Sequence, residues 1–258
     1  MQNFTIRGKK ENKGIYRVPT SLKDISLERL ILYQQEIESQ KPQSLFTVES
    51  ADLTPENVLQ IVLSQPAEER AKWLEFYRKQ VCYWCDMDIS VAQTIKDIDI
   101  VGLRNMIVNM FNDFVYDPNV RKFEHAGANY IISNRYMEGS VLIEFIESME
   151  YEHRYQNAIE AAGDESEYGA YIRSMKYNRL SILPKIMCLL CKQEIDGLPE
   201  QYHDLIVEKH EADMLKVNCE VALNVAFFLQ RQKIWFTKDF PTFLTRHPLK
   251  LLKQVCKN

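Results

Sequence analysis

The sequence predicts a mainly α-helical protein, a multi-helix bundle with one small β-hairpin at about residues 121–133. Three observations predict this class. Only 8 Gly and 9 Pro occur in 258 residues, so long segments contain no helix breaker. Apolar residues recur at three- and four-residue steps over most of the chain, which is the helical period. Only around the predicted hairpin does the period change to two.

The first part of the chain is predicted to be an extended arm followed by helices. The residues before Pro19 have no helical period. Ser26 then caps a helix whose Leu27, Leu30, Ile31 and Ile37 share one face. Thr54 and Pro55 form the next helix start, with a capping side chain and a proline at the first helical position. Helices are predicted here, in order, at residues 54–63, 66–84, 91–95 and 99–114.

The hairpin follows a break at Asp117-Pro118-Asn119. Two alternating segments flank Ala126-Gly127-Ala128, where the glycine supplies the tight turn. A lone hairpin is only marginally stable, so it is expected to lie against helices or a partner's strand. Later helices are predicted at residues 140–149, 168–191 with a kink or break at Pro184, 198–210, 214–235 as the central core helix, and 249–255.

These elements suggest three parts. Residues 1–22 form a basic extended arm, residues 23–116 an N-terminal helical lobe, and residues 117–258 a C-terminal lobe of the hairpin and helices. No low-complexity linker divides the chain, so the two lobes are compatible with one domain.

The charge is unevenly distributed. A net charge of -4 argues against a protein dedicated to coating nucleic acid. The arm is different, because five cationic residues stand against Glu11 alone, a balance of plus four (5 − 1). The cations are Arg7, Lys9, Lys10, Lys13 and Arg17. Two interpretations remain open: a solvated terminus, or an arm that lies on an acidic partner or on nucleic acid.

The sequence indicates synthesis in the cytoplasm. No stretch approaches the roughly 18–20 apolar residues needed to span a bilayer, so no membrane partner is expected. The basic N-terminus has no apolar segment behind it, which is unlike a secretory signal. Six cysteines without such a leader indicate free thiols in a reducing compartment.

Four of the cysteines form two CxxC pairs, Cys82 with Cys85 and Cys188 with Cys191. This spacing suits a structural zinc ion, and a redox dithiol is a further alternative. The pairs are about 100 residues apart and each stands in an apolar helical run rather than on a glycine-bearing knuckle. Cysteine is also one of the residues most often buried. The sequence therefore favours buried core thiols, with no metal and no cofactor.

Two acidic pairs, Asp86-x-Asp88 and Asp97-x-Asp99, resemble ligands of a divalent cation. Both stand where helices are expected to begin, and acids favourable to the helix dipole explain them better. Among the histidines, His203 and His210 are seven residues apart and could share a helical face. No carboxylate or cysteine arrangement is evident around them, so they are expected to be structural or surface residues.

No catalytic motif is evident. The chain has no glycine-rich loop, nucleophile elbow or HExxH, and its serines and lysines form no nucleophile pattern. We therefore expect no catalytic residues and no enzymatic activity, although an enzyme with an unrecognised helical site remains an alternative. Most of the 13 Tyr, 12 Phe and 3 Trp are expected in the core, with some at interfaces.

Two segments together resemble known proteins. One is the entry through Val18-Pro19 into an amphipathic helix that reaches Tyr33, and the other is the hairpin from Phe123 to Ile132, followed by Ser140–Glu147. This order resembles small virion and assembly proteins of tailed bacteriophages, including tail-assembly-chaperone-like and crAss-like phage structural proteins. In those an F-x-x-x-G-x-x-Y hairpin leads into a helix, and a hydrophobic helix closes the chain. Where that pattern has an asparagine–glycine turn, this chain has Ala126-Gly127 instead.

The resemblance implies a non-enzymatic component of the neck, tail or capsid contents, or an assembly chaperone. It implies other phage structural proteins as partners, a homo-oligomer or symmetric assembly, and a location in the virion, with the host cytoplasm during assembly. The basic arm and the hairpin residues Phe123 and Tyr130 are then the candidate partner-binding residues, the hairpin by strand addition. The alternative is a nucleic-acid-associated module that uses the arm and a CxxC zinc site.

Overall fold

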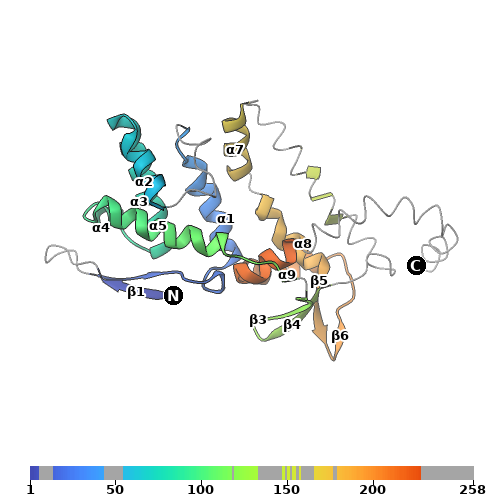
Figure 1. The fold of residues 1–258 in the computed structure, drawn as a ribbon. Helices are drawn as coiled ribbons and strands as arrows, with labels where there is room; N and C mark the ends of the chain where they lie inside the picture. The colour runs from blue at the N-terminus through green and yellow to red at the C-terminus, as the bar shows by residue number, and fades with distance from the viewer. Residues whose placement is uncertain are drawn as a thin grey trace. The chain divides into compact units, whose positions relative to one another are not determined.

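The computed structural model describes residues 1–5, 14–43, 55–117, 119–132, 147–148, 150–151, 153–154, 157, 166–176 and 179–227. Of these, 64% are helical, which confirms the mainly α class. The chain forms two compact units. Figure 1 labels helices and strands of each. Unit 1 comprises Met1–Phe114 and Ile159–Arg179, and unit 2 comprises Val115–Ala158 and Leu180–Asn258. The predicted division into an arm and two lobes remains a prediction about domains.

Unit 1 combines one two-stranded antiparallel sheet with helices. Strand β1 (Gln2–Thr5) pairs with β2 (Ile15–Val18), with Gln2 opposite Val18 and Thr5 opposite Ile15. The helices are α1 (Leu27–Glu36), α2 (Pro55–Ser64), α3 (Ala67–Cys85), α4 (Ile89–Ala92), α5 (Asp97–Asn112) and α7 (Glu167–Lys176), with short 3-10 turns at Leu22–Asp24 and Glu38–Gln40.

The helices predicted behind the Ser26 cap and at 54–63, 66–84 and 99–114 are confirmed, and caps explain where helices of unit 1 begin. The helix predicted at 91–95 is displaced, because α4 begins at Ile89 and ends at Ala92. The Ser26 hydroxyl accepts a hydrogen bond from the Arg29 amide at 3.2 Å at the start of α1. Asp88 caps α4 in the same way, accepting from the Ser90 amide at 2.8 Å. Asp97 and Asp99 lie in the first turn of α5. Asp86 differs from the prediction, because it ends α3 with a left-handed φ of 50° instead of starting a helix.

The core of unit 1 is built around α3. Its Trp73 and Tyr77 are fully buried, with ring centroids 5.6 Å apart. Trp84 packs against Tyr33 of α1 at 4.7 Å. Three large apolar residues of α5, Leu103, Met110 and Phe111, are only half-buried. The buried residues of α5 are Ile100, Val101, Asn105 and Ile107.

Two polar contacts tie distant segments of unit 1 together. Arg29 of α1 donates hydrogen bonds to the carbonyls of Tyr83 and Trp84, at 2.7 and 3.3 Å, and so satisfies the C-terminal end of α3. Helix α7 returns to this unit and packs against α1 and the 3-10 turn Glu38–Gln40. Directly after this turn, the Lys41 carbonyl accepts a hydrogen bond from the Tyr168 hydroxyl at 2.8 Å.

Unit 2 contains a four-stranded antiparallel sheet with helices. Its sheet order is β3-β4-β5-β6, formed by β3 (Lys122–His125), β4 (Ala128–Ile132), β5 (Cys191–Ile195) and β6 (Leu198–Pro199). Helix α8 (Leu183–Leu190) packs against α9 (Ile206–Lys216), and a further helix covers residues 219–227. Side chains such as Met187, Leu189 and Met214 are completely buried in this unit.

The predicted hairpin is confirmed as β3 and β4. Ala126 and Gly127 have φ of 51° and 76°, the left-handed pair that a two-residue hairpin turn needs. Its expected support comes from the chain itself, because β5 pairs with β4 and Ile132 lies opposite Cys191.

Three predicted helices of the second half need correction. The segment 168–191 does break near Pro184, which lies in the first turn of α8, but Cys191 begins β5. The helix predicted at 198–210 is wrong over its first residues, because Asp196-Gly197 turns the chain into β6 and α9 begins only at Ile206. The helix predicted at 214–235 is interrupted, because α9 ends at Lys216 and Asn218 caps the next helix by accepting from the Val221 amide at 3.1 Å.

Other predictions fall wholly or mainly outside the described residues. This holds for the helix at 249–255 and for residues 228–235. Within the predicted helix at 140–149, the structure describes residues 147 and 148, which are helical.

Candidate functional site

The inner face of the sheet in unit 2 gathers polar and aromatic side chains beside α9. Phe123, Tyr130 and Gln193 lie opposite one another on neighbouring strands. The Glu200 amide, directly after β6, continues this row by donating to the Gln193 carbonyl at 2.7 Å. His210 of α9 stands with its ring edge-on to Tyr130, with centroids 6.3 Å apart. The row therefore ends at a buried carboxylate that lies beside a buried histidine.

Glu200 is the centre of a charged cluster. Its side chain is 8% exposed, and Nζ of Lys209 and Nε2 of His210 lie 2.5 and 2.7 Å from its two oxygens. Nε2 of His203 lies 3.4 Å away. Burial by itself raises the pKa of Glu200, but the hydrogen bonds from Lys209 and His210 outweigh burial and lower the pKa.

The cluster is suited to holding the sheet against α9 rather than to catalysis. A carboxyl whose pKa is lowered is a weak base near neutral pH. Burial, together with the charge of Asp213 and other neighbours, raises the pKa of Tyr130, so its phenol stays protonated. Lys209 and His210, both of α9, meet at the carboxylate of Glu200 directly after β6 and so fix the end of β6 relative to α9.

The sequence did not predict this cluster, although it singled out His203 and His210. The carboxylate that was not evident from the sequence is Glu200, which both histidines reach. The overlooked signal is the position of Glu200, three residues before His203 and ten before His210.

The structure places the predicted partner-binding rings in the core. Phe123 is 8% exposed and Tyr130 is 2% exposed, and the two rings stack with centroids 5.1 Å apart. The hairpin therefore does not expose these two rings for direct contact with a partner. The exposed side chains of β3 are Lys122 and Glu124 on the outer face.

The predicted basic arm is only partly described. Arg7, Lys9, Lys10 and Lys13 lie outside the described residues, while Arg17 is exposed on β2 opposite Asn3. The segments on both sides of the four cations belong to paired strands.

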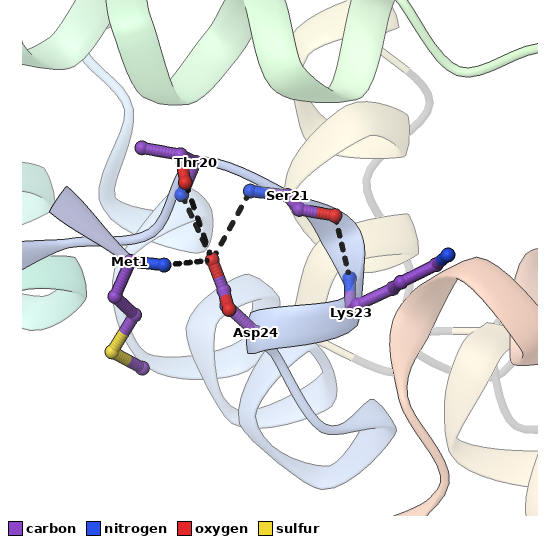
Figure 2. A network of polar contacts seen from close by, with 5 residues as sticks. All are labelled: Met1, Thr20, Ser21, Lys23 and Asp24. Atoms are coloured by element: carbon purple, nitrogen blue, oxygen red, sulfur yellow. Dashed lines mark hydrogen bonds and ion pairs between the residues drawn. The ribbon is translucent and has the colours of Figure 1, made fainter.

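The start of the chain is anchored at Asp24, as Figure 2 shows. One oxygen of Asp24 accepts from the amino group of Met1 at 2.7 Å, from the Thr20 amide at 3.2 Å and from the Ser21 amide at 3.3 Å. The Ser21 hydroxyl accepts from the Lys23 amide. The amino group lowers the pKa of Asp24, so this carboxylate remains charged over a wide pH range.

One CxxC pair lies in each unit. Cys85 is buried and Cys82 half-buried at the end of α3, whereas Cys188 and Cys191 are buried at the junction of α8 and β5. Burial raises the pKa of Cys82 to about 11 and that of Cys188 to about 12. Within the part of the chain that the structure describes, no three His, Cys, Asp or Glu side chains are grouped so that they could hold a metal ion.

Two hollows are lined by charged residues that pair with each other. One of about 470 Å³ in unit 1 is bordered by Arg78 and Asp97, which form an ion pair. One of about 210 Å³ in unit 2 is bordered by Arg154 and Glu150, also an ion pair. The Arg154–Glu150 pair is exposed, and exposed pairs are ordinary surface features.

Comparison with known proteins gives no match to any protein family, curated protein or solved structure. Among the described helices, none has the length and apolar character needed to cross a membrane.

Proposed function

We propose that this protein is a non-enzymatic structural or assembly protein of a tailed bacteriophage, which acts through contacts with other structural proteins. The phage context comes from the sequence resemblance carried by residues 17–33, 123–132 and 140–147. The contact function is supported by one observation in unit 2: the β5–β6 hairpin carries an exposed apolar pair beside its turn.

This pair consists of Ile195 and Leu198, which lie directly opposite each other. Their exposed fractions are 46% and 69%. Single exposed apolar residues are normal on any surface, but opposite residues of an antiparallel pair point to the same side and add their areas. Two adjacent apolar side chains on a projecting turn suit insertion into an apolar pocket of a partner.

The test uses density-gradient purification of phage particles and of assembly intermediates from infected cells, followed by mass spectrometry. We expect the chain to sediment with particles or with an intermediate. The double variant Ile195→Ser, Leu198→Ser should lose this association. A matched control is Ile98→Ser, which removes an exposed side chain of α5 in unit 1 that is 55% exposed. Absence of the unmodified chain from both fractions would refute the proposal.

A second candidate function is nucleic-acid contact by the basic segment. The observation that favours it is the β1–β2 pairing, because four cations fall within the short connection between two paired strands. Concentrated positive charge of this kind binds phosphates with strong salt dependence. Fluorescence anisotropy with a duplex DNA should show binding that weakens as salt rises and is lost in the variant Lys9→Glu, Lys10→Glu. Equal binding by this variant would exclude the candidate.

A further inference from the structure

Strand β3 is an edge of the four-stranded sheet, and its outer backbone groups can be identified from the register. His125 lies opposite Ala128 across a two-residue turn, which makes this a hydrogen-bonded pair. Such pairs alternate along a ladder, and the 2.8 Å bond from the Ile132 amide to the Arg121 carbonyl fits this alternation. The backbone groups of Lys122 and Glu124 therefore point away from β4. No described residue outside β4 pairs with β3.

The side chains on this edge carry opposite charges. Lys122 and Glu124 are both exposed on the outer face, while Phe123 between them faces inwards. Lys122 lies 3.2 Å from Glu194 of its own chain. Glu124 has no ion-pair partner among the described residues, so one charge of the edge is available for a second strand.

We propose that β3 pairs antiparallel with β3 of a second copy, with the two Phe123 residues facing each other on a two-fold axis. In this register Lys122 of each copy faces Glu124 of the other, and both pairs use backbone groups that point outwards. The strands then exchange hydrogen bonds at both pairs, and the same two pairs bring opposite charges together on the outer face.

The neighbouring registers that use the same outward groups are unfavourable. Sliding one strand by two residues in one direction places Lys122 opposite Lys122 of the second copy, and sliding it by two residues the other way places Glu124 opposite Glu124. Like charges directly opposite each other are destabilising. The charge pattern of β3 thus favours one register and a closed two-fold dimer, in which each edge covers the other.

This inference rests on the proposed function in that the protein acts by protein–protein contact, and it names a second copy of this chain as one partner. The dimer and the assembly role can be refuted independently of each other. A chain that sediments with phage particles but never self-associates refutes the dimer alone. A dimer with no association to particles refutes the assembly role alone.

The experiment is sedimentation-velocity ultracentrifugation of the full chain over roughly 1 µM to 1 mM, because an interface of one short strand belongs to the weak class. We expect concentration-dependent dimers. Lys122→Glu and Glu124→Lys each turn two attractive pairs into two repulsive ones, so each should raise the Kd for self-association by at least about tenfold.

An experiment that mixes the two single variants is the decisive test. An equimolar mixture of the Lys122→Glu and Glu124→Lys chains restores opposite charges at both pairs, so we expect it to dimerise more tightly than either variant does alone. The double variant Lys122→Glu, Glu124→Lys should dimerise by itself. Glu194→Gln is the control, because it removes the contact of Lys122 within its own chain but leaves the proposed interface intact.

A monomeric wild type throughout the range would overturn the proposal, as would a dimer that neither single variant weakens. Single variants that stay monomeric when mixed would also contradict it. Circular dichroism and thermal unfolding of each variant verify that the fold is retained. If the β3 edge instead binds a strand of another protein, the wild-type chain will bind that protein and will not self-associate.

Discussion

Asp24 joins the start of the chain to the entry of α1 through one carboxylate. Replacing it by Ala removes three hydrogen bonds of 3.3 Å or less, and we expect a loss of about 1 kcal/mol in the free energy of unfolding. Urea titration at neutral pH measures this loss. Asp113→Ala is the control, because Asp113 is an exposed aspartate at the end of α5.

The pH dependence of this contribution follows from the sign of the shift. Because the pKa of Asp24 is lower in the folded state than its ordinary value, its stabilisation is present above that value and is lost as the pH falls through the folded pKa. The difference between wild type and Asp24→Asn should therefore shrink between about pH 5 and about pH 2. A constant difference over this interval would show that the carboxylate charge is not involved.

Glu200 is expected to matter more than another acid of the same sheet. Glu200→Ala leaves buried His210 without its carboxylate, and an unsatisfied buried polar group costs about 1–3 kcal/mol. Glu194→Ala removes the contact with exposed Lys122, and surface pairs contribute about 0–1 kcal/mol. Guanidinium unfolding of both variants provides the comparison. Equal losses would mean that the cluster around Glu200 does not hold the sheet against α9.

At the scale of elements, replacing glycine by alanine is expected to change stability in opposite directions at the turn of the β3–β4 hairpin and inside α5. Gly127 has φ of 76°, and a Cβ there would meet no atom within 4 Å, so Gly127→Ala introduces backbone strain alone. We expect it to lower the free energy of unfolding by roughly 1–2 kcal/mol. Gly102→Ala in α5 also meets no atom, but there alanine favours the helix and should raise stability by up to about 1 kcal/mol. Thermal unfolding should shift in opposite directions.

The elements that the sequence predicts correctly are those with strong local signals. Helix α1 has a Ser26 cap and a repeating apolar face, and β3 and β4 flank a glycine turn. The second hairpin also had a local signal, Asp196-Gly197, but its strands are short, and β5 is held in the sheet by pairing with β4. Asn218 was likewise an available N-cap inside an apolar run.

The candidate site was even harder to predict from local sequence signals than the second hairpin. Phe123 and Tyr130 are adjacent across a local hairpin, so their pairing follows from the sequence. The contact of Glu200 with His210 depends on where β6 leaves the sheet and where α9 begins, and both were misplaced by the predicted helix at 198–210. Tertiary pairing, which a periodicity argument does not contain, decides this part of the site.

At the scale of the whole molecule, each unit has its own apolar core, and buried cysteines lie in both. Cys85 belongs to unit 1, and Cys188, Cys191 and Cys219 belong to unit 2. These thiols therefore report separately on the integrity of the two units. Two of the interpretations of the CxxC pairs, core thiols and a zinc site, predict different chemistry for these thiols.

Alkylation with iodoacetamide at about pH 8 distinguishes these interpretations, because only the thiolate reacts. Burial raises the pKa of Cys85, Cys188 and Cys219 to about 12 and also restricts access, so these thiols should stay unmodified in the folded protein. Cys82, half-buried with a pKa raised to about 11, should react slowly. Peptide mapping by mass spectrometry measures each site, and urea should make all of them reactive.

A chelator should change nothing if the thiols are core residues. Zinc-bound thiolates would instead be released by the chelator and become reactive without unfolding, and that result would replace the core interpretation with a metal site.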